Sequence, residues 1–201
     1  MRLRFLSGQR EQLPAIRGHG LLLRGPEPGD AAQWLQVRSQ SSNFLVPWEP
    51  EWPRDDLTPA GFRRRLNHYE RDWNERKGCT FFLFRESDMK LLGGLGFTNM
   101  RMGASRSCTL GYWCGVMHAG KGNMSKGVAM ALPFAFQTLG MRRVEAACIP
   151  GNLRSKKLLE RLGFRQEGLL RSYLEINGER RDHLLYALLN DDPTGIPADA
   201  D

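Results

Sequence analysis

The residues of this sequence that most directly indicate chemistry are two glycines flanking a lysine, Gly120-Lys121-Gly122. They follow an apolar stretch that predicts a strand over residues 107–116, and an amphipathic pattern after them predicts a helix. The first turn of a helix carries backbone N–H groups without intrahelical partners and the positive end of the helix dipole. Glycine lets the backbone approach a ligand closely and lysine adds a cation, so the junction predicts a phosphate or pyrophosphate site. Paired glycines also occur in loops that need only a tight turn, and the rest of the sequence has to decide between these interpretations.

The composition indicates one globular domain. The 201 residues are 41% hydrophobic and 25% charged, which is ordinary for a folded chain of this length. No apolar run approaches the roughly 20 residues of a membrane span, and the N-terminus lacks the apolar core of a signal peptide, so we expect a cytoplasmic protein that binds no membrane. The net charge of +7 favours an anionic partner such as a phosphorylated cofactor. The basic residues are scattered, so we expect no sequence-specific nucleic-acid binding.

The cysteines and histidines show no spacing typical of a metal site. All the cysteines fall in apolar runs and none forms a C-x-x-C pair, which predicts buried, reduced side chains. The histidines have no ligand spacing with each other or with the cysteines, so we expect no metal. The residues concerned are Cys79, Cys108, Cys114 and Cys148, and His19, His68, His118 and His183.

The predicted elements alternate between strands and helices before a final pair of strands. This order predicts an α/β or α+β fold with a mixed sheet, and it places the glycine turn at the end of a strand, where ligands commonly bind. The expected strands are residues 21–23, 79–84, 90–97, 107–116, 144–149, 164–176 and 183–189, and the expected helices are residues 31–41, 59–77, 123–139 and 152–162. We expect residues 1–20 to form an N-terminal extension with a short strand at 3–6, residues 21–190 the domain, and residues 191–201 a flexible acidic tail.

An aromatic and acidic segment at residues 44–53 is predicted to be a loop, because its three prolines deny it regular hydrogen bonding. Its tryptophans and carboxylates suit the rim of a groove that takes a cationic peptide, which makes Trp48 and Glu49 candidate substrate-binding residues. The alternative is that the tryptophans only clamp the next helix. That helix is predicted to begin with Thr58 as its N-cap and Pro59 as its first residue.

Three segments together resemble the GCN5-related N-acetyltransferases (GNAT): LGYWCGVMHAGKGN, RRVEAACIPGNLRSKKLLERLGFRQEGLLR and INGERRDHLLYALL. The pairing of FLVPWEP with RDHLLYAL is similar to the RimJ-type ribosomal-protein alanine N-acetyltransferases. The resemblance covers residues 21–189. It implies a mostly antiparallel central sheet flanked by helices, with two strands splayed at a site for acetyl-coenzyme A.

The resemblance also implies how acetyl-coenzyme A is held. Its pantetheine arm would pair with the end of the strand at residues 107–116, and its pyrophosphate would lie on the glycine turn. Two positions of the family's Q/R-x-x-G-x-G/A pattern depart here, Ala119 and Met124, and a methionine at the last of them could crowd the cofactor. The expected cofactor-binding residues are Cys114, Gly115, Val116, Gly120, Lys121, Gly122, Asn123, Met124, Asn152 and Ser155.

The expected catalytic residues are Glu145, Ser155 and Glu175. Glu145 interrupts an apolar strand just before the segment of Asn152 and is the first candidate for the general base, with Glu175 or water as the reserve. A structural ion pair with Arg142 or Arg143 is the alternative role of Glu145. The family's usual general-acid tyrosine falls at Leu159, which leaves Ser155 as a substitute, and Asn152 could be an ordinary N-cap. Tyr112 and Tyr173 join Trp48 and Glu49 as expected substrate-binding residues.

The sequence therefore favours an N-acetyltransferase that moves an acetyl group from acetyl-coenzyme A to a protein N-terminal α-amino group by direct transfer in a ternary complex. The resemblance makes a ribosomal protein the expected acceptor, with possible ribosome association by a monomer or homodimer. Two alternatives stay open: acetylation of a small amine such as an antibiotic, and a catalytically weak ribosome-assembly factor with the same fold.

Overall fold

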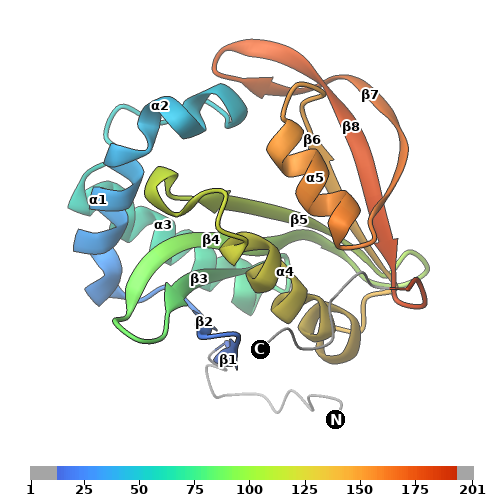
Figure 1. Ribbon diagram of the computed structural model, residues 1–201, viewed down its shortest axis with the longest axis horizontal. Helices are drawn as coiled ribbons and strands as arrows, with labels where there is room; N and C mark the ends of the chain where they lie inside the picture. The colour runs from blue at the N-terminus through green and yellow to red at the C-terminus, as the bar shows by residue number, and fades with distance from the viewer. Residues whose placement is uncertain (1–12, 194–201) are drawn as a thin grey trace.

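The computed structural model describes residues 13–193, which form one eight-stranded sheet flanked by helices (Figure 1). The strands lie in the order β1-β2-β3-β4-β5-β6-β8-β7, and only β5 and β6 pair in parallel. The predicted mixed sheet is thus confirmed as mostly antiparallel. The strands are β1 (Ile16–Gly18), β2 (Leu21–Arg24), β3 (Cys79–Arg85), β4 (Lys90–Arg101), β5 (Ser107–Cys114), β6 (Arg143–Cys148), β7 (Arg165–Ile176) and β8 (Glu179–Leu189).

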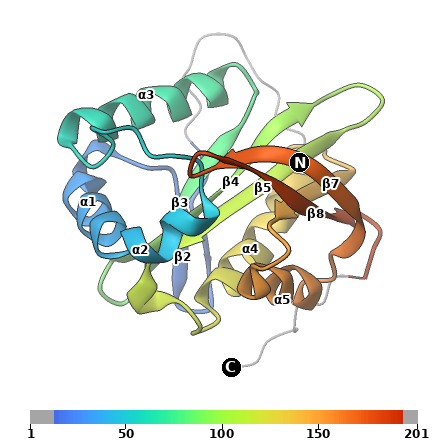
Figure 2. The same cartoon turned by 90° about the horizontal axis from the view of Figure 1, so that it is seen from above.

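Helices cover both faces of the sheet, and each face has its own apolar cluster (Figure 2). The larger cluster packs side chains of α4 and α5 against one face, and the smaller one packs α1 and α3 against the other. The α-helices are α1 (Ala31–Gln40), α2 (Ser42–Leu45), α3 (Pro59–Asn74), α4 (Asn123–Pro133) and α5 (Leu153–Arg161). Short turns of other helix types are η1 (Pro28–Asp30), η2 (Val46–Trp48), η3 (Val116–His118) and η4 (Phe134–Thr138).

The parallel pair β5 and β6 separates soon after it forms. Their register runs only from Ser107 opposite Arg143 to Thr109 opposite Glu145. Beyond this point β5 stays paired with β4 and β6 stays paired with β8, so the two strands diverge. The divergence opens the centre of the sheet between α4 and α5, as the resemblance implies.

Hydrogen bonds and backbone angles show how the sequence determines several local features. The Thr58 hydroxyl oxygen accepts a hydrogen bond from the Gly61 amide at 3.0 Å, so Thr58 caps α3 as expected. Asn177 and Gly178 both have positive φ, at 46° and 83°, which fits the tight turn between β7 and β8. Gly140 ends the helical segment after α4 with a φ of 71°.

One local prediction is wrong. The segment predicted as an irregular loop begins with α2 and η2, because Pro47 lies in the first turn of η2, where no backbone donor is needed. The expected N-terminal extension contributes β1, which pairs with β2. α4 ends at Pro133, and a π-helical turn, η4, follows it directly. The strand expected at residues 3–6 and most of the acidic tail lie outside the described residues.

Within residues 13–193, no helix combines the length and the apolar character needed to cross a membrane.

Candidate active site

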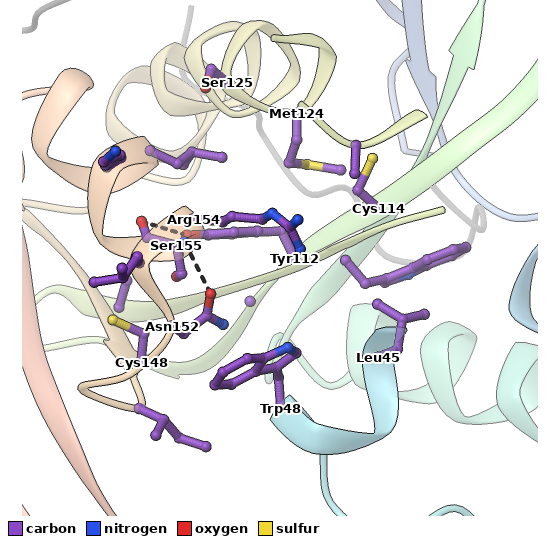
Figure 3. A pocket seen from close by; sticks show the side chains of 18 of the residues that line it. Leu45, Trp48, Tyr112, Cys114, Met124, Ser125, Cys148, Asn152, Arg154 and Ser155 are labelled. Atoms are coloured by element: carbon purple, nitrogen blue, oxygen red, sulfur yellow. Dashed lines mark hydrogen bonds between the residues drawn. The ribbon is translucent and has the colours of Figure 1, made fainter. Parts of the chain in front are cut away.

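A cavity of about 710 Å³ lies where β5 and β6 separate (Figure 3). Its walls come from α2 and η2, the end of β5, the glycine turn, the start of α4, the end of β6, α5 with the residues before it, and one residue of β8. Several predicted site residues line it: Trp48, Glu49, Tyr112, Cys114, Gly120, Gly122, Asn123, Met124, Asn152 and Ser155. Residues that are distant in the sequence therefore meet in one place.

The glycine turn presents free backbone donors to this cavity. Gly120 and Gly122 have φ values of 75° and 76°, in the left-handed region that favours glycine. A Cβ added at either position would meet no atom within 4 Å, so open space lies over the turn. The first backbone bond of α4 runs from the Lys126 amide to the Gly122 carbonyl, and no side chain caps this helix end. The preceding amides thus fit an anion such as a pyrophosphate.

Two nearby cations make this end of the cavity electropositive. Burial, followed by the charges of Lys90 and Lys121, lowers the pKa of His118, whose side chain also lines the cavity. The same positive potential favours a bound phosphate. The Lys121 side chain itself is exposed and is not among the lining residues.

Met124 does not fill the cavity in the way that its position in the glycine pattern suggests. Its side chain is 6% exposed and belongs to the larger core cluster. Its Cε atom lies 3.0 Å from where a Cβ of Gly93 would stand, so the methionine occupies space that this glycine leaves empty. Met124 and Cys114 lie side by side at one end of the cavity (Figure 3). The departure from the pattern is therefore compensated by packing, because the flexible thioether is directed into the core.

A tyrosine and a serine meet across the gap between β5 and α5. The Tyr112 and Ser155 hydroxyl oxygens are 2.8 Å apart, and the Asn152 Oδ1 atom accepts a hydrogen bond from the Ser155 amide at 3.2 Å (Figure 3). Asn152 thus caps α5 and also lines the cavity, so its two suggested roles are compatible. Burial raises the pKa of Tyr112, and the hydrogen bond with Ser155 lowers it by less. Tyr112 is therefore a neutral hydrogen-bond donor at physiological pH.

The aromatic and acidic segment forms the opposite wall, where Trp48 faces the cavity (Figure 3). Glu49 lines the same wall, and its carboxylate accepts hydrogen bonds from Arg38 at 2.8 and 2.6 Å and from Trp52 Nε1 at 2.8 Å. The Arg38 guanidinium also lies 4.1 Å from the centroid of the Trp52 ring. Of the two tryptophans, Trp52 thus fixes Glu49 and Trp48 lines the cavity.

Four predicted binding residues lie outside the cavity lining: Gly115, Val116, Lys121 and Tyr173. The Gly115 amide donates to the Leu92 carbonyl at 2.8 Å, and the Val116 amide donates to the Ser41 hydroxyl at 2.9 Å. Both donors are thus already satisfied within the protein. Tyr173 lies on β7 and packs its ring against His183, which does line the cavity.

Glu145 and Glu175, the expected general bases, also lie outside the cavity lining. Glu145 lies opposite Thr109, where β5 and β6 are still paired, and it accepts a hydrogen bond from Arg143 at 2.8 Å. The structure therefore shows the ion pair that the sequence offered as the alternative role of Glu145. Glu175 is exposed on β7 opposite Arg180. Neither carboxylate is placed to take a proton from an amine inside the cavity.

The substitution Glu145→Gln should therefore leave turnover near that of the unsubstituted protein, because the ion pair of Glu145 with Arg143 lies outside the cavity. Steady-state rates at saturating acetyl-coenzyme A, with cofactor affinity measured on the same samples, provide the check. A fall of about 10²–10⁴-fold in Glu145→Gln, the size expected for loss of a general base, would return the role to this glutamate.

Comparisons with known proteins agree with this geometry. A family model described as an acetyltransferase (GNAT) domain matches residues 20–165. The [ribosomal protein uS5]-alanine N-acetyltransferase of Escherichia coli (strain K12) is 33% identical over 189 residues, which cover 93% of this chain and 97% of that protein. The probable N-acetyltransferase YjcK of Bacillus subtilis (strain 168) is 32% identical over 177 residues, which cover 88% and 98%. The solved structure of Mycobacterium smegmatis RimJ in complex with CoA-disulfide superposes with a TM-score of 0.83 at 30% identity, covering 90% of this chain and 88% of that one.

The chain belongs to the GNAT acetyltransferase family. It is an acetyl-coenzyme A-dependent acyltransferase whose relatives include RimJ-type ribosomal-protein alanine N-acetyltransferases. The divergence of β5 and β6, the uncapped start of α4 and the open space above the glycine turn are the features of this acetyltransferase that suit coenzyme A. Within the described part of the chain, no group of three or more His, Cys, Asp or Glu residues could hold a metal ion.

The acetyltransferase cavity also contains residues that the sequence did not indicate. His118, Arg154, Lys157, Arg161 and His183 line it. The Arg154 guanidinium lies 5.0 Å from the centroid of the Phe44 ring, which joins α5 to α2 across the cavity mouth. Basic residues on α5 carried no distinctive sequence signal, because an amphipathic helix commonly has a charged outer face. The position of His183 follows only from the pairing of β6 with β8.

Proposed function

We propose that this acetyltransferase modifies the N-terminal α-amino group of a protein, and that the acceptor is a ribosomal protein. The observation that carries the proposal is a single cavity with two unlike ends. One end has the uncapped glycine turn at α4, and the other has Trp48 and Glu49 on η2 and the residue after it. The Escherichia coli relative, 33% identical over nearly its whole length, is named for acetylating an alanine of ribosomal protein uS5.

In this proposal, acetyl-coenzyme A supplies the activated acetyl group as a thioester. The amides at the start of α4 hold its pyrophosphate, and Asn152 and the open edge of β5 near Cys114 hold the pantetheine arm. The hydroxyl pair of Tyr112 and Ser155 lies beside this arm. It stabilises negative charge that develops on the sulfur and passes a proton to it, which is the work of a general acid.

The acceptor end suits a cationic, extended peptide terminus. Two hydrogen bonds from Arg38 hold the Glu49 carboxylate in a fixed position at the end of the cavity where an ammonium group would enter. The Trp48 ring, 38% exposed, supplies an apolar wall for the first residues of the peptide. An α-amino group with a pKa of about 8 is neutral far more often at pH 7 than a lysine with a pKa of about 10.4. The difference of about 2.4 units corresponds to roughly 3.3 kcal/mol and favours the α-amino group as nucleophile.

A panel of acceptors tests this proposal. Peptides that begin with alanine or serine should gain one acetyl group, whereas α-blocked peptides with an internal lysine should not. Initial rates measured while both substrates are varied should give intersecting lines, as direct transfer in a ternary complex requires. Preferential acetylation of a small polyamine or aminoglycoside would favour the small-amine alternative. Failure of acetyl-coenzyme A to raise the melting temperature would favour a non-enzymatic role.

Removing the Tyr112 hydroxyl should lower turnover by about 10- to 100-fold, because a hydrogen bond to a charged group contributes about 1.5–3 kcal/mol. The affinity for acetyl-coenzyme A should change little, since Ser155 and Asn152 remain. Tyr112→Phe is compared with Tyr186→Phe, which loses a hydrogen bond to Glu160 of 3.0 Å but does not line the cavity. Equal turnover in the two variants would exclude Tyr112 from the proton transfer.

A further inference from the structure

One histidine of the cavity has a role in neither the fold nor the proposed cofactor site. His183 lies on β8, where the pairing with β6 places Leu184 opposite Cys148. Its side chain is only 3% exposed, yet it lines the cavity. A buried imidazole that borders a ligand cavity is a candidate general acid or base.

His183 lies on the face of the sheet opposite to the Tyr112–Ser155 pair. Leu184 and Tyr186 pack in the core cluster beneath α4 and α5, as does Tyr112. Because side chains alternate along a strand, His183 lies on the other face of the sheet, the face on which Trp113 of β5 packs. The imidazole and the Tyr112 hydroxyl therefore border the same cavity from the two sides of the opening between β5 and β6.

The hydrogen bonding of His183 determines which ring nitrogen can act as a base. Its Nδ1 atom lies 3.0 Å from the backbone carbonyl oxygen of Arg181. A carbonyl oxygen can only accept a hydrogen bond, so Nδ1 carries the proton. In the neutral imidazole the lone pair is then on Nε2, and none of the residues from 13 to 193 hydrogen-bonds that atom. Nε2 is thus free to accept a proton from a ligand.

Neighbouring groups hold the imidazole in this orientation. The Tyr173 ring packs edge-on against it, with centroids 5.5 Å apart. The register of β7 shifts between Leu170 and Leu174, and the Ser172 amide within this irregular stretch donates to Asp182 Oδ1 at 2.8 Å. The stretch therefore places Tyr173 over the histidine, which gives the predicted substrate-binding tyrosine a positioning role.

The nearby carboxylates are less suitable than His183 as proton acceptors for a ligand in the cavity. Both oxygens of Glu49 already accept hydrogen bonds from Arg38, and one also accepts from Trp52. Donors of the protein therefore already occupy this carboxylate, which leaves it poorly placed to accept a proton from an amine. Glu145 is paired with Arg143, and Glu175 is exposed on β7, so neither lines the cavity.

We propose that His183 is the general base that takes the proton from the acceptor's ammonium group through Nε2. The inference rests on the proposed function, because it presumes an amine acceptor. The ammonium transfers one proton to Nε2, and the neutral amine forms a C–N bond with the acetyl carbon while the C–S bond breaks. The amine nitrogen then loses its second proton to water. The departing sulfur gains a proton from the Tyr112–Ser155 pair, which takes one back from water, and His183 releases its proton to water. The products are the acetylated amine, the free thiol and one proton.

The substitution His183→Asn distinguishes a general base from a residue with a purely structural role. The side-chain amide of asparagine can keep the hydrogen bond to the Arg181 carbonyl, but it cannot accept a proton. We expect His183→Asn to bind acetyl-coenzyme A as the parent protein does and to lose about 10²–10⁴-fold in kcat. His68→Asn, on α3 away from the cavity, controls for the loss of a histidine and should keep full activity.

An acceptor that is uncharged at pH 7 tests the first proton transfer separately from the rest of the reaction. A peptide whose terminal amine is replaced by a hydrazide needs no base for its first proton, so His183→Asn should regain much of its lost rate on that acceptor. Equal losses on the amine and the hydrazide would contradict the proposal, and so would parent-like kcat on the amine. If the parent protein acetylates no amine, the proposed function fails and the inference fails with it. A parent protein that is active beside an equally active His183→Asn overturns only the inference.

A chemical modification tests the same claim without a substitution. Diethyl pyrocarbonate reacts with unprotonated imidazole nitrogen, and mass spectrometry locates the modified histidine. Loss of activity in the parent protein should follow modification of His183 and not of His68. Complete modification of His183 with activity retained would overturn the proposal. Absence of any reaction at His183 would contradict the free Nε2 on which it rests.

Discussion

Replacing Gly122 with valine is expected to weaken coenzyme A binding by about 10- to 100-fold, the equivalent of one charge-assisted hydrogen bond of about 1.5–3 kcal/mol. Gly122 has a φ of 76° and a ψ of −9° at the start of α4. A β-branched residue is strongly disfavoured in this conformation. The valine would therefore either distort the start of the helix or place its side chain in the open space above the turn. Both outcomes remove amide contacts to a pyrophosphate.

Gly140 provides the matched control for this substitution. It has a φ of 71° and, like Gly122, no atom within 4 Å of an added Cβ, but it does not line the cavity. Gly122→Val and Gly140→Val should therefore lose similar thermal stability, about 1–2 kcal/mol from the left-handed backbone. Titration calorimetry with coenzyme A should separate them, with only Gly122→Val losing affinity. Equal affinities would mean that the glycine turn does not hold the cofactor.

The second large effect is expected on stability. Glu49→Ala should destabilise the protein by about 3–5 kcal/mol, because it leaves a buried guanidinium without its partner. The Arg38 side chain is only 5% exposed, and its guanidinium lies 4.1 and 5.1 Å from the ring centroids of Trp52 and Trp113. Its Nε atom already has no hydrogen-bond partner, so the protein does not offer the charge another acceptor there. For a chain of this size, the loss corresponds to a fall in Tm of roughly 6–20 °C.

An exposed ion pair elsewhere in the protein is the control for the burial of the Arg38–Glu49 pair. Arg85 and Asp88 make two hydrogen bonds of 2.9 and 2.7 Å, but their side chains are 46% and 47% exposed. Asp88→Ala should therefore lower Tm much less than Glu49→Ala, although it breaks a similar pair. The double substitution Arg38→Met with Glu49→Ala should recover part of the loss, because no buried charge remains. If Glu49→Ala and Asp88→Ala melt alike, the burial of Arg38 is not what makes Glu49 important.

Features with local causes could be predicted from the sequence. The glycine turn and the Asn152 cap depend on neighbouring residues, since positive φ values and helix ends are determined within a few positions. The same holds for Thr58 at the start of α3 and for the turn at Asn177-Gly178. The order of strands and helices predicted the mixed sheet for a similar reason, because each element has its own hydrophobic periodicity.

Features that depend on strand register could not be predicted in this way. Glu145 interrupts an apolar run and so suggested a functional carboxylate, but its function depends on where β5 and β6 separate. Glu145 falls on the paired side of that point, opposite Thr109. His183 is the opposite case: it lies in the RDHLLYAL segment that carries part of the family resemblance, but nothing in the sequence indicated that its side chain borders the site. Its place at the cavity follows from pairing with β6, which lies more than thirty residues earlier in the chain.

The direction of the Met124 side chain also could not be predicted from the sequence. Met124 suggested a crowded cofactor site, because the glycine pattern has a small residue at this position. The space that accepts the methionine is provided by Gly93 on β4, a residue distant in the sequence. Such compensation between distant residues is visible only once the sheet is assembled.

If one cavity joins acetyl-coenzyme A to a protein N-terminus, a free α-amino group should be acetylated in preference to a lysine. The most direct measurement places two peptides in one tube with the protein and acetyl-coenzyme A. One has a free N-terminal alanine and no lysine, and the other has a blocked N-terminus and one internal lysine. Intact-mass spectrometry over time should show one added acetyl group on the first peptide while the second stays unmodified. Faster acetylation of the blocked peptide, or none of either, would contradict the account.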